Sequence, residues 1–280
     1  MKNVKYGPYE RNVLNLWQAK SEKPTPVLIR IHGGGWTGGA KDEVLSEKDE
    51  YLDAGISVVS ISYRLTNTDI LPAPVYDAAR ALQFVRYKAK EWNLDKNRIA
   101  LTGGSAGGCS SLWLALHDDM ADPGNADPVL RESTKPTCIA VMSGQTCLDP
   151  EWIEKNIGPK GNKHRMIFLS FGAKSAEEMT ENKDKYQKMI REFSPIFHVD
   201  KNDPPIYMEY GGGISTPAKD PNHGIHHGMY GIKLKEEADK VGLECQLKIK
   251  GYSESNYSSP LSFIKAKFSE VKVQENKGNL

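Results

Sequence analysis

The chain has 280 residues, of which 39% are hydrophobic and 26% are charged, a composition typical of a globular protein with a sizeable core. Its 37 Lys and Arg residues nearly balance its 36 Asp and Glu residues, so nothing in the charge favours nucleic acid or an anionic membrane as a partner. No apolar run approaches the ~20 residues that span a bilayer. The segment that begins at Met1 has no apolar signal core, but a signal peptide is removed from a mature protein, so cytoplasmic and secreted locations both stay open.

Apolar, β-branched runs alternate with helical patterns along the chain, which predicts a mostly parallel sheet with helices on both faces. Turn residues bound most of the runs, as expected for buried strands. In chain order, the predicted strands cover residues 27–31, 57–62, 99–102, 138–142, 206–210 and 245–249, and the predicted helices cover residues 75–92, 107–117 and 230–241.

The interval 148–203 differs from the rest of the chain because it is rich in charge. Its segment "KSAEEMTENKDKYQKMIREF" predicts one exposed amphipathic helix. We therefore predict a single domain over residues 1–280, with a helical insertion at 148–203 above the sheet. Ligands of open α/β sheets bind beyond the carboxyl ends of the strands, so this insertion is either a lid or pocket wall, or a plain solvated helix.

The four cysteines show no CxxC spacing, which argues against a zinc or redox motif. Three of them lie in or beside apolar runs, so we expect buried, unreactive thiols and no metal or organic cofactor. These residues are Cys109, Cys138, Cys147 and Cys245.

Two glycine-rich segments follow predicted strands. The first, "RIHGGGWTGG", covers residues 30–39 and follows an apolar run. The second, "LTGGSAGGCSS", covers residues 101–111 and contains a G-x-S-x-G pattern centred on Ser105, between a predicted strand and a predicted helix. That context is the one in which a serine occupies a strained turn and exposes its hydroxyl above the sheet.

Together the two motifs resemble those of the α/β-hydrolase esterases and lipases with an HGGGW oxyanion loop, including carbohydrate-esterase-like and feruloyl-esterase-like members. The resemblance covers nearly the whole chain and includes "VVSISYRL" and "FSPIFHVDKNDPPIYMEYG". It implies the α/β-hydrolase fold, with Ser105 as the nucleophile. It also implies that the backbone N–H groups of Gly34, Gly35 and Ala106 form the oxyanion hole, and that His32 holds the loop.

The proton-transfer residues depart from the family pattern, in which an acid and then a histidine follow the nucleophile. The acid usually follows the strand predicted at 206–210, and the histidine the strand predicted at 245–249. Here the last histidine is His227, and "KGYSESNYSSP" after the final strand contains none.

Three interpretations of "NHGIHHG" remain open. In the first, the base has moved to His226 or His227, with Glu254 or Asp149 as its orienting carboxylate. Related chains with a similar "IHH" before this helix favour His226. In the second, the catalytic residues are degenerate and the protein binds a small ligand or carbohydrate without turnover. In the third, His223 and His226 belong to a metal site, although no carboxylate partner is fixed for them.

The sequence thus predicts a serine esterase that forms an acyl-enzyme on Ser105 and needs no cofactor. The expected substrate is a small-molecule or carbohydrate-linked ester with a short acyl group, which the resemblance suggests. The competing prediction is a catalytically degenerate protein of the same fold. The position of the imidazole relative to Ser105 Oγ distinguishes the two.

Overall fold

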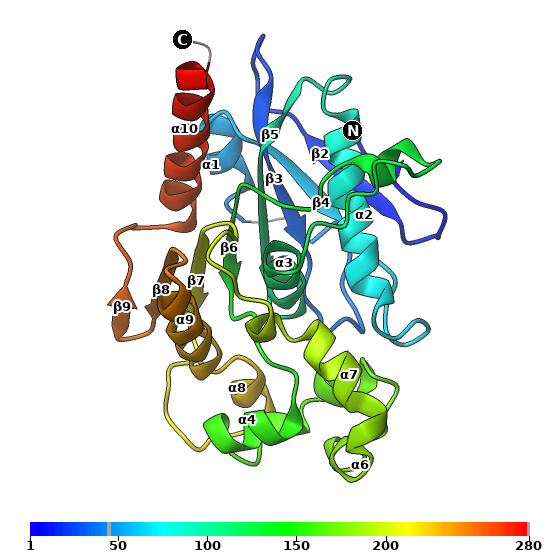
Figure 1. Cartoon of the computed structure of the whole chain (residues 1–280), viewed down its shortest axis with the longest axis vertical. Helices are drawn as coiled ribbons and strands as arrows, with labels where there is room; N and C mark the ends of the chain where they lie inside the picture. Colours follow the sequence, from blue (N-terminus) through cyan, green and yellow to red (C-terminus); the bar gives the residue numbers. More distant parts are fainter. Residues whose placement is uncertain (44–45, 279–280) are drawn as a thin grey trace.

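A nine-stranded sheet forms the centre of the computed structural model, which describes residues 1–43 and 46–278, with side chains as far as residue 271. The strand order is β1-β2-β4-β3-β5-β6-β7-β8-β9 (Figure 1). The six inner strands from β4 to β8 are parallel, whereas β1, β2 and β9 pair in antiparallel fashion at the two edges. The predicted mostly parallel sheet is therefore confirmed.

The predicted strands all form, and three short edge strands add to them. The parallel strands are β3 (Thr25–Ile31), β4 (Ser57–Ile61), β5 (Leu94–Gly104), β6 (Cys138–Met142), β7 (Ile206–Tyr210) and β8 (Cys245–Ile249). The edge strands are β1 (Val4–Lys5), β2 (Val13–Trp17) and β9 (Tyr252–Glu254). Because β3 to β8 run in the same direction, the segments that follow them emerge at one edge of the sheet.

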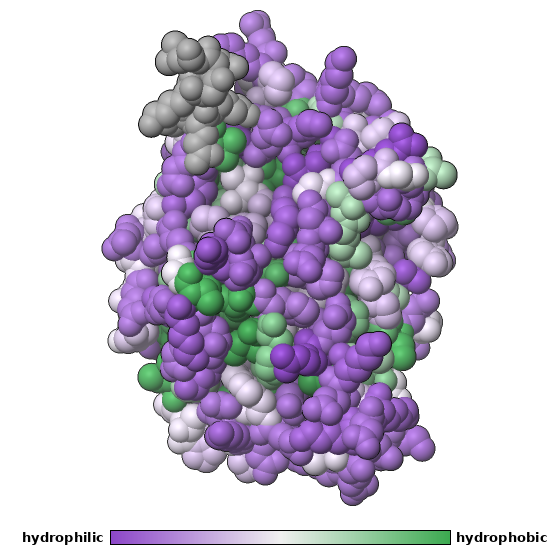
Figure 2. Space-filling view, viewed as in Figure 1, coloured by the Kyte–Doolittle hydropathy of each residue, from purple (hydrophilic) through white to green (hydrophobic). Residues whose placement is uncertain are grey.

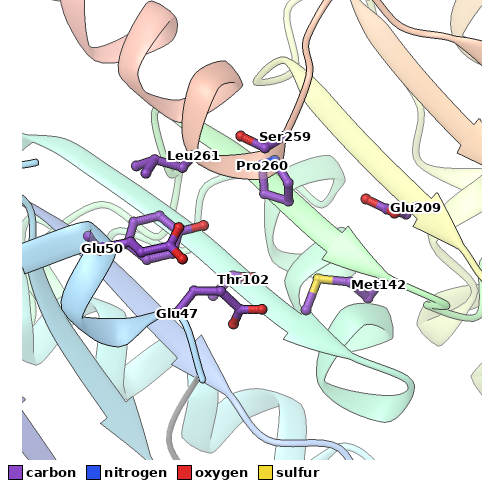
Figure 3. Close-up of a pocket in the computed structure, with 9 residues that line it drawn as sticks. Glu47, Glu50, Thr102, Met142, Glu209, Ser259, Pro260 and Leu261 are labelled. Carbon is purple, nitrogen blue, oxygen red and sulfur yellow. The ribbon is translucent and has the colours of Figure 1, made fainter.

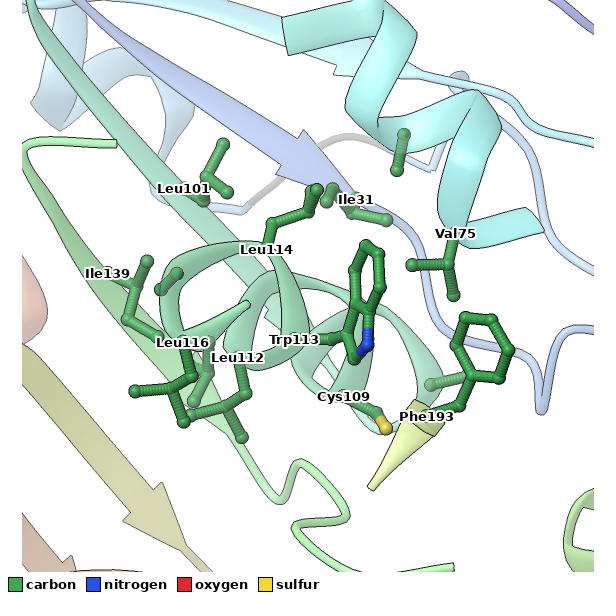
Figure 4. Close-up of a cluster of buried hydrophobic side chains, with 14 of the residues drawn as sticks. Ile31, Val75, Leu101, Cys109, Leu112, Trp113, Leu114, Leu116, Ile139 and Phe193 are labelled. Atoms are coloured by element: carbon green, nitrogen blue, oxygen red, sulfur yellow. The ribbon is translucent and has the colours of Figure 1, made fainter. Parts of the chain in front are cut away.

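Helices cover both faces of the sheet and divide the core in two. The larger cluster packs α2 (Ala73–Lys88), α3 (Ala106–Leu116) and α9 (Met229–Val241) against one face. The smaller packs α1 (Lys48–Asp53) and α10 (Pro260–Gly278) against the other. Figure 4 shows the first cluster around α3, whose residues are all buried. A fully buried α3 fixes the position of the residue from which it starts.

The four cysteines are buried and free, as expected. Burial raises the pKa of the Cys147 thiol to about 12, and it raises the pKa values of the other three as well. Thiols of this kind stay protonated and are poor nucleophiles.

The segment between β6 and β7 is helical, and it lies with α8 (Pro221–Ile225) at the lower end of the view in Figure 1. Its helices are α4 (Pro150–Ile157), η2 (Gly161–Lys163), α5 (Arg165–Leu169), α6 (Ala176–Glu181), α7 (Lys183–Phe193) and η3 (Pro195–Phe197). The prediction of a single amphipathic helix in this interval is wrong. Asn182, with φ −114° and ψ 43°, leaves the helical region of backbone conformation and separates α6 from α7.

Most of the face seen in Figure 2 is hydrophilic, and apolar side chains show only in patches between polar ones. Across the described residues, none of the helices combines the length and the apolar character needed to cross a membrane.

Candidate active site

Ser105 occupies a sharp turn between β5 and α3. Its φ of 53° is positive, a conformation that costs a non-glycine residue free energy. The turn is held on both sides: Ser105 N donates to Met142 O at 2.9 Å, and Ser105 O accepts the helical N–H of Cys109 at 2.9 Å. The strain at Ser105 is therefore supported by β6 and by the buried helix that follows.

The glycines of this turn are required by close backbone contacts. A Cβ on Gly107 would overlap the carbonyl oxygen of Ile31 at the end of β3. A Cβ on Gly103 would come within 2.5 Å of the Gly107 carbonyl carbon. The absence of side chains here lets α3 start directly against β3, which brings the loop after β3 beside Ser105.

The loop after β3 is braced at both ends. Tyr63 stacks on His32 with ring centroids 4.0 Å apart, and its hydroxyl donates to the carbonyls of His32 and Gly33 at 2.8 and 3.0 Å. Arg11 Nη2 donates to Gly39 O at 2.6 Å. Burial lowers the pKa of His32 to about 4, so this ring stays neutral. His32 faces the loop it supports, and its contacts agree with the structural role that the resemblance implies.

Three backbone N–H groups near Ser105 have no partner among the described residues. Gly34 and Gly35 have left-handed φ angles of 87° and 59°, and Ala106 is the first residue of α3. In the part of the chain that the structure describes, no hydrogen bond occupies the N–H of Gly34, Gly35 or Ala106. The loop touches the nucleophile turn at Gly33, where a Cβ would lie 3.6 Å from Ser105 Cβ. Free donors of this kind suit an oxyanion.

The structure brings His226 to Ser105. His226 Nε2 lies 3.0 Å from Ser105 Oγ, although the two residues are 121 positions apart in sequence. His226 caps the C-terminal end of α8, which follows the loop after β7. The imidazole thus arrives from β7 and α8, and not from the loop after the last parallel strand.

The other nitrogen of His226 has a backbone partner. Nδ1 lies 3.0 Å from Asn222 O, one helical turn earlier in α8. A carbonyl can only accept, so Nδ1 carries the proton and Nε2 presents its lone pair to Ser105. Burial lowers the pKa of His226, and the Asn222 carbonyl partly opposes that shift. A neutral ring with its lone pair on the serine has the geometry of a general base.

The neighbouring histidines face elsewhere. His227 is fully buried, lies 3.2 Å from Ser215 O through Nε2 and accepts the N–H of Met229 through Nδ1. His223 accepts the N–H of Lys219 and lies 2.9 Å from Gly212 O. Among the described residues, no group of three or more possible ligands is placed to hold a metal ion.

Neither predicted carboxylate reaches an imidazole. Glu254 is in the exposed edge strand β9, bonded to the Tyr252 hydroxyl and 3.6 Å from Lys235 Nζ. Asp149 caps α4 by accepting the N–H of Glu151 at 2.9 Å. The expectation that Glu254 or Asp149 orients the base is therefore wrong, because β9 turns back along the sheet edge and α4 holds Asp149.

A cavity of about 320 Å³ lies near the loop where the family order would place the base. Ser259 and Pro260, at the start of α10, border it together with Glu47, Met142 and Glu209 (Figure 3). It lies between α1 and α10, on the sheet face opposite α3. None of the described residues that line this cavity is a histidine, so its lining supplies no imidazole to Ser105.

Gln145 is a site residue that the sequence did not reveal. It is fully buried, and its amide donates to Ile225 O at 2.6 Å and to Ser143 O at 3.2 Å. It thereby ties the loop after β6 to the residue just before His226. A lone glutamine in a loop gives no sequence signal for such a contact.

His164 is a second residue that the sequence did not assign to the site. It precedes α5, and its Cε1 lies 3.6 Å from the point where a Cβ on Gly35 would stand. The charged segment around it left a pocket wall and a solvated surface equally open, so only the folded chain places this imidazole beside the loop that contains Gly35.

Comparison with known proteins finds esterases among the relatives of this chain. The sequence model of the BD-FAE family matches residues 14–213. Esterase LipQ and esterase LipC, both of Mycobacterium tuberculosis, are 26% and 27% identical to the chain, and each alignment covers 75% of it. The chain spans about half the length of these relatives, 48% and 50% respectively.

Solved structures show the same α/β-hydrolase fold. A truncated carbohydrate esterase from gut microbiota superposes with a TM-score of 0.76 at 20% identity, over 96% of both chains. An acetyl ester-xyloside bifunctional hydrolase from Caldicellulosiruptor lactoaceticus gives a TM-score of 0.65 at 25% identity, over 95% of this chain and 88% of the other.

Proposed function

The chain belongs to the BD-FAE family, and we propose that it is a serine esterase that hydrolyses short acyl esters of carbohydrates. The observation that carries the proposal is the 3.0 Å contact between Ser105 Oγ and His226 Nε2, beside three free backbone N–H groups. The names of the esterase relatives and of the two carbohydrate-active structures support the substrate class.

The proposed reaction has two balanced steps. Ser105 Oγ bonds to the carbonyl carbon of the ester while its proton passes to His226 Nε2, and the N–H groups of Gly34, Gly35 and Ala106 bind the resulting oxyanion. The C–O bond to the alcohol then breaks, and the alcohol leaves with the proton of His226. Water then bonds to the acyl carbon and loses one proton to His226 Nε2. The bond between that carbon and Ser105 Oγ breaks, His226 returns the proton to Oγ, and the carboxylic acid departs.

In this scheme the Asn222 carbonyl takes the place of the usual carboxylate. It fixes the tautomer and the ring orientation of His226, and it stabilises the imidazolium formed in each step through its partial negative charge. A carbonyl is a weaker partner for imidazolium than a carboxylate is. We therefore expect a working dyad with a lower kcat than a full triad would give.

The alternative of binding without turnover rested on the missing C-terminal histidine. The contact between His226 and Ser105 supplies an imidazole from another segment and supports hydrolysis over mere binding.

Covalent labelling tests the proposal. Purified protein is incubated with a fluorophosphonate and, separately, assayed on p-nitrophenyl acetate and on acetylated xylan, with Ser105→Ala as the control. We expect one label per chain, mapped to Ser105 by mass spectrometry, and hydrolysis of both esters only by the wild type. Wild-type protein that takes no label and hydrolyses esters no faster than Ser105→Ala would contradict the proposal.

A further inference from the structure

From the insertion between β6 and β7, we infer that His164 contacts the alcohol half of the substrate, donating its Nε2–H to a hydroxyl or ether oxygen next to the ester. The inference rests on the proposed function and adds a residue that determines which alcohol part of an ester the enzyme prefers. Four features of the structure carry it.

The first is the position of the ring. Its Cε1 is 3.6 Å from where a Gly35 Cβ would stand, and Met166 Cβ is 3.5 Å from the same point. His164 therefore lies against the open side of Gly35 in the proposed oxyanion loop. Since Nε2 is bonded to Cε1, it lies at the same rim of the site.

The second is the way in which the ring is anchored. His164 follows η2 and His226 follows the last residue of α8. Gly161 in η2 and Gly224 in α8 pack backbone to backbone, since a Cβ on Gly224 would come within 2.5 Å of Gly161 Cα. The two imidazoles thus emerge from the ends of two short helices in direct contact.

The third is the hydrogen-bonding state of the ring. His164 Nδ1 accepts the N–H of Met166 at 3.3 Å and so caps α5. An accepting Nδ1 requires the proton on Nε2 in the neutral ring. Over the described residues, Nε2 has no hydrogen-bond partner. A half-buried donor is left free at the site.

The fourth is charge. Burial lowers the pKa of His164, and the positive forms of His226 and Arg165 lower it further. The ring is thus a neutral donor and an electrostatic neighbour of His226. In the proposed mechanism His226 returns its proton to the leaving alcohol, so the alcohol half lies on the His226 side of Ser105. A carbohydrate ester carries hydroxyl and ring oxygens within one or two bonds of that position.

Two substitutions separate the donor from the helix cap. Asn at position 164 can place an amide oxygen near the position of Nδ1, which keeps the cap but removes the Nε2 donor. Gln can place an amide N–H near the position of Nε2, which keeps the donor but weakens the cap. The probes are 2-methoxyethyl acetate and butyl acetate, which differ only by an ether oxygen in place of a methylene.

The test compares the ratio of kcat/KM for 2-methoxyethyl acetate to that for butyl acetate, measured by pH-stat titration. We expect His164→Asn to lower this ratio about 3- to 10-fold, the effect of one neutral hydrogen bond, and His164→Gln to retain it. An unchanged ratio in His164→Asn, or equal losses on both esters in both variants, would overturn the inference while leaving the esterase intact. Wild-type protein inactive on both esters would instead refute the proposed function, and the inference with it.

Discussion

The candidate site has a nucleophile half, formed by Ser105 and the loop with Gly34 and Gly35, and a proton-transfer half, formed by His226. The two halves are held in different ways. The backbone holds the proposed nucleophile and the proposed oxyanion donors. Ser105 is fixed between β5 and a fully buried α3, and the loop around Gly34 and Gly35 is packed against that turn. The proposed base, His226, lies outside the sheet, at the C-terminal cap of the five-residue helix α8. Its position depends on the side-chain amide of Gln145 and on one carbonyl, that of Asn222.

This difference explains why only one half departs from the family order. Ser105 depends on a strand-to-helix junction at which β3, β5 and α3 meet, and its strained turn is specific to that junction's close backbone packing. A general base requires only that an imidazole reach the serine with the correct tautomer. Any loop at the same sheet edge can satisfy that condition, as the loop after β7 does here.

The largest expected effect concerns the base. His226→Ala removes the proton acceptor, so we expect kcat on p-nitrophenyl acetate to fall on the order of 10⁴-fold or more. His227→Ala and Glu254→Gln are the matched controls, because His227 faces Ser215 and Glu254 faces Lys235. Folded His227→Ala and Glu254→Gln proteins should keep near-wild-type kcat, and a loss in either equal to that of His226→Ala would refute the assignment.

The next effect concerns the backbone of the nucleophile half. Gly107→Ala would place a Cβ on Ile31 O, so we expect a destabilisation of about 1–3 kcal/mol or more, measured by urea unfolding. Gly124→Ala is the control, because only Asp122 Oδ1, at 3.7 Å, faces a Cβ there. Equal stabilities of the two variants would show that the close packing of α3 against β3 is not required.

A third prediction concerns the hydrogen bonds by which Gln145 holds the segment before His226. Gln145→Met removes the bonds to Ile225 O and Ser143 O, so we expect a loss of about 1–3 kcal/mol in stability. Because His226 then loses its fixed position, kcat should fall on the order of 10- to 100-fold with little change in KM.

The control for Gln145→Met is another buried glutamine, Gln83. Gln83 donates to the carbonyls of Leu130 and Glu132 at 3.3 and 2.8 Å, away from the site. Gln83→Met should lower stability by a similar amount and leave kcat unchanged. A parallel loss of kcat in both variants would indicate general destabilisation and no positioning role for Gln145.

The smallest effect is a shift in the pH profile. The base must be neutral, so kcat/KM should rise with pH through the pKa of His226, which burial holds below the usual 6.5. We expect the acid inflection of log(kcat/KM) below pH 6.5 in the wild type, and the same inflection in His164→Asn. An inflection above 6.5 would mean that His226 is not held neutral as the structure indicates.

Sequence alone predicted the core of the fold, which the structure confirms, and it singled out the turn that carries the proposed nucleophile. The strands from β3 to β8 and the helices α2, α3 and α9 follow from hydrophobic periodicity, which acts over a few residues. The turn at Ser105 needs small residues at positions fixed by its own geometry, so its glycines are visible in the chain. The edge strands β1 and β9, with two and three residues, are too short to carry a periodic pattern, and β2 and α10 are further elements that the predicted set lacks.

Only the tertiary structure decided the proton-transfer half. Three histidines within five residues, His223, His226 and His227, are equivalent as a pattern, and the packing of α8 against η2 determines which one meets Ser105, 121 positions away. The group that we propose to orient His226 is the Asn222 carbonyl, a group that every residue possesses and no sequence can single out. Contacts between distant segments depend on how the elements pack, and that packing placed His226, Gln145 and His164 around a serine that the chain had already marked.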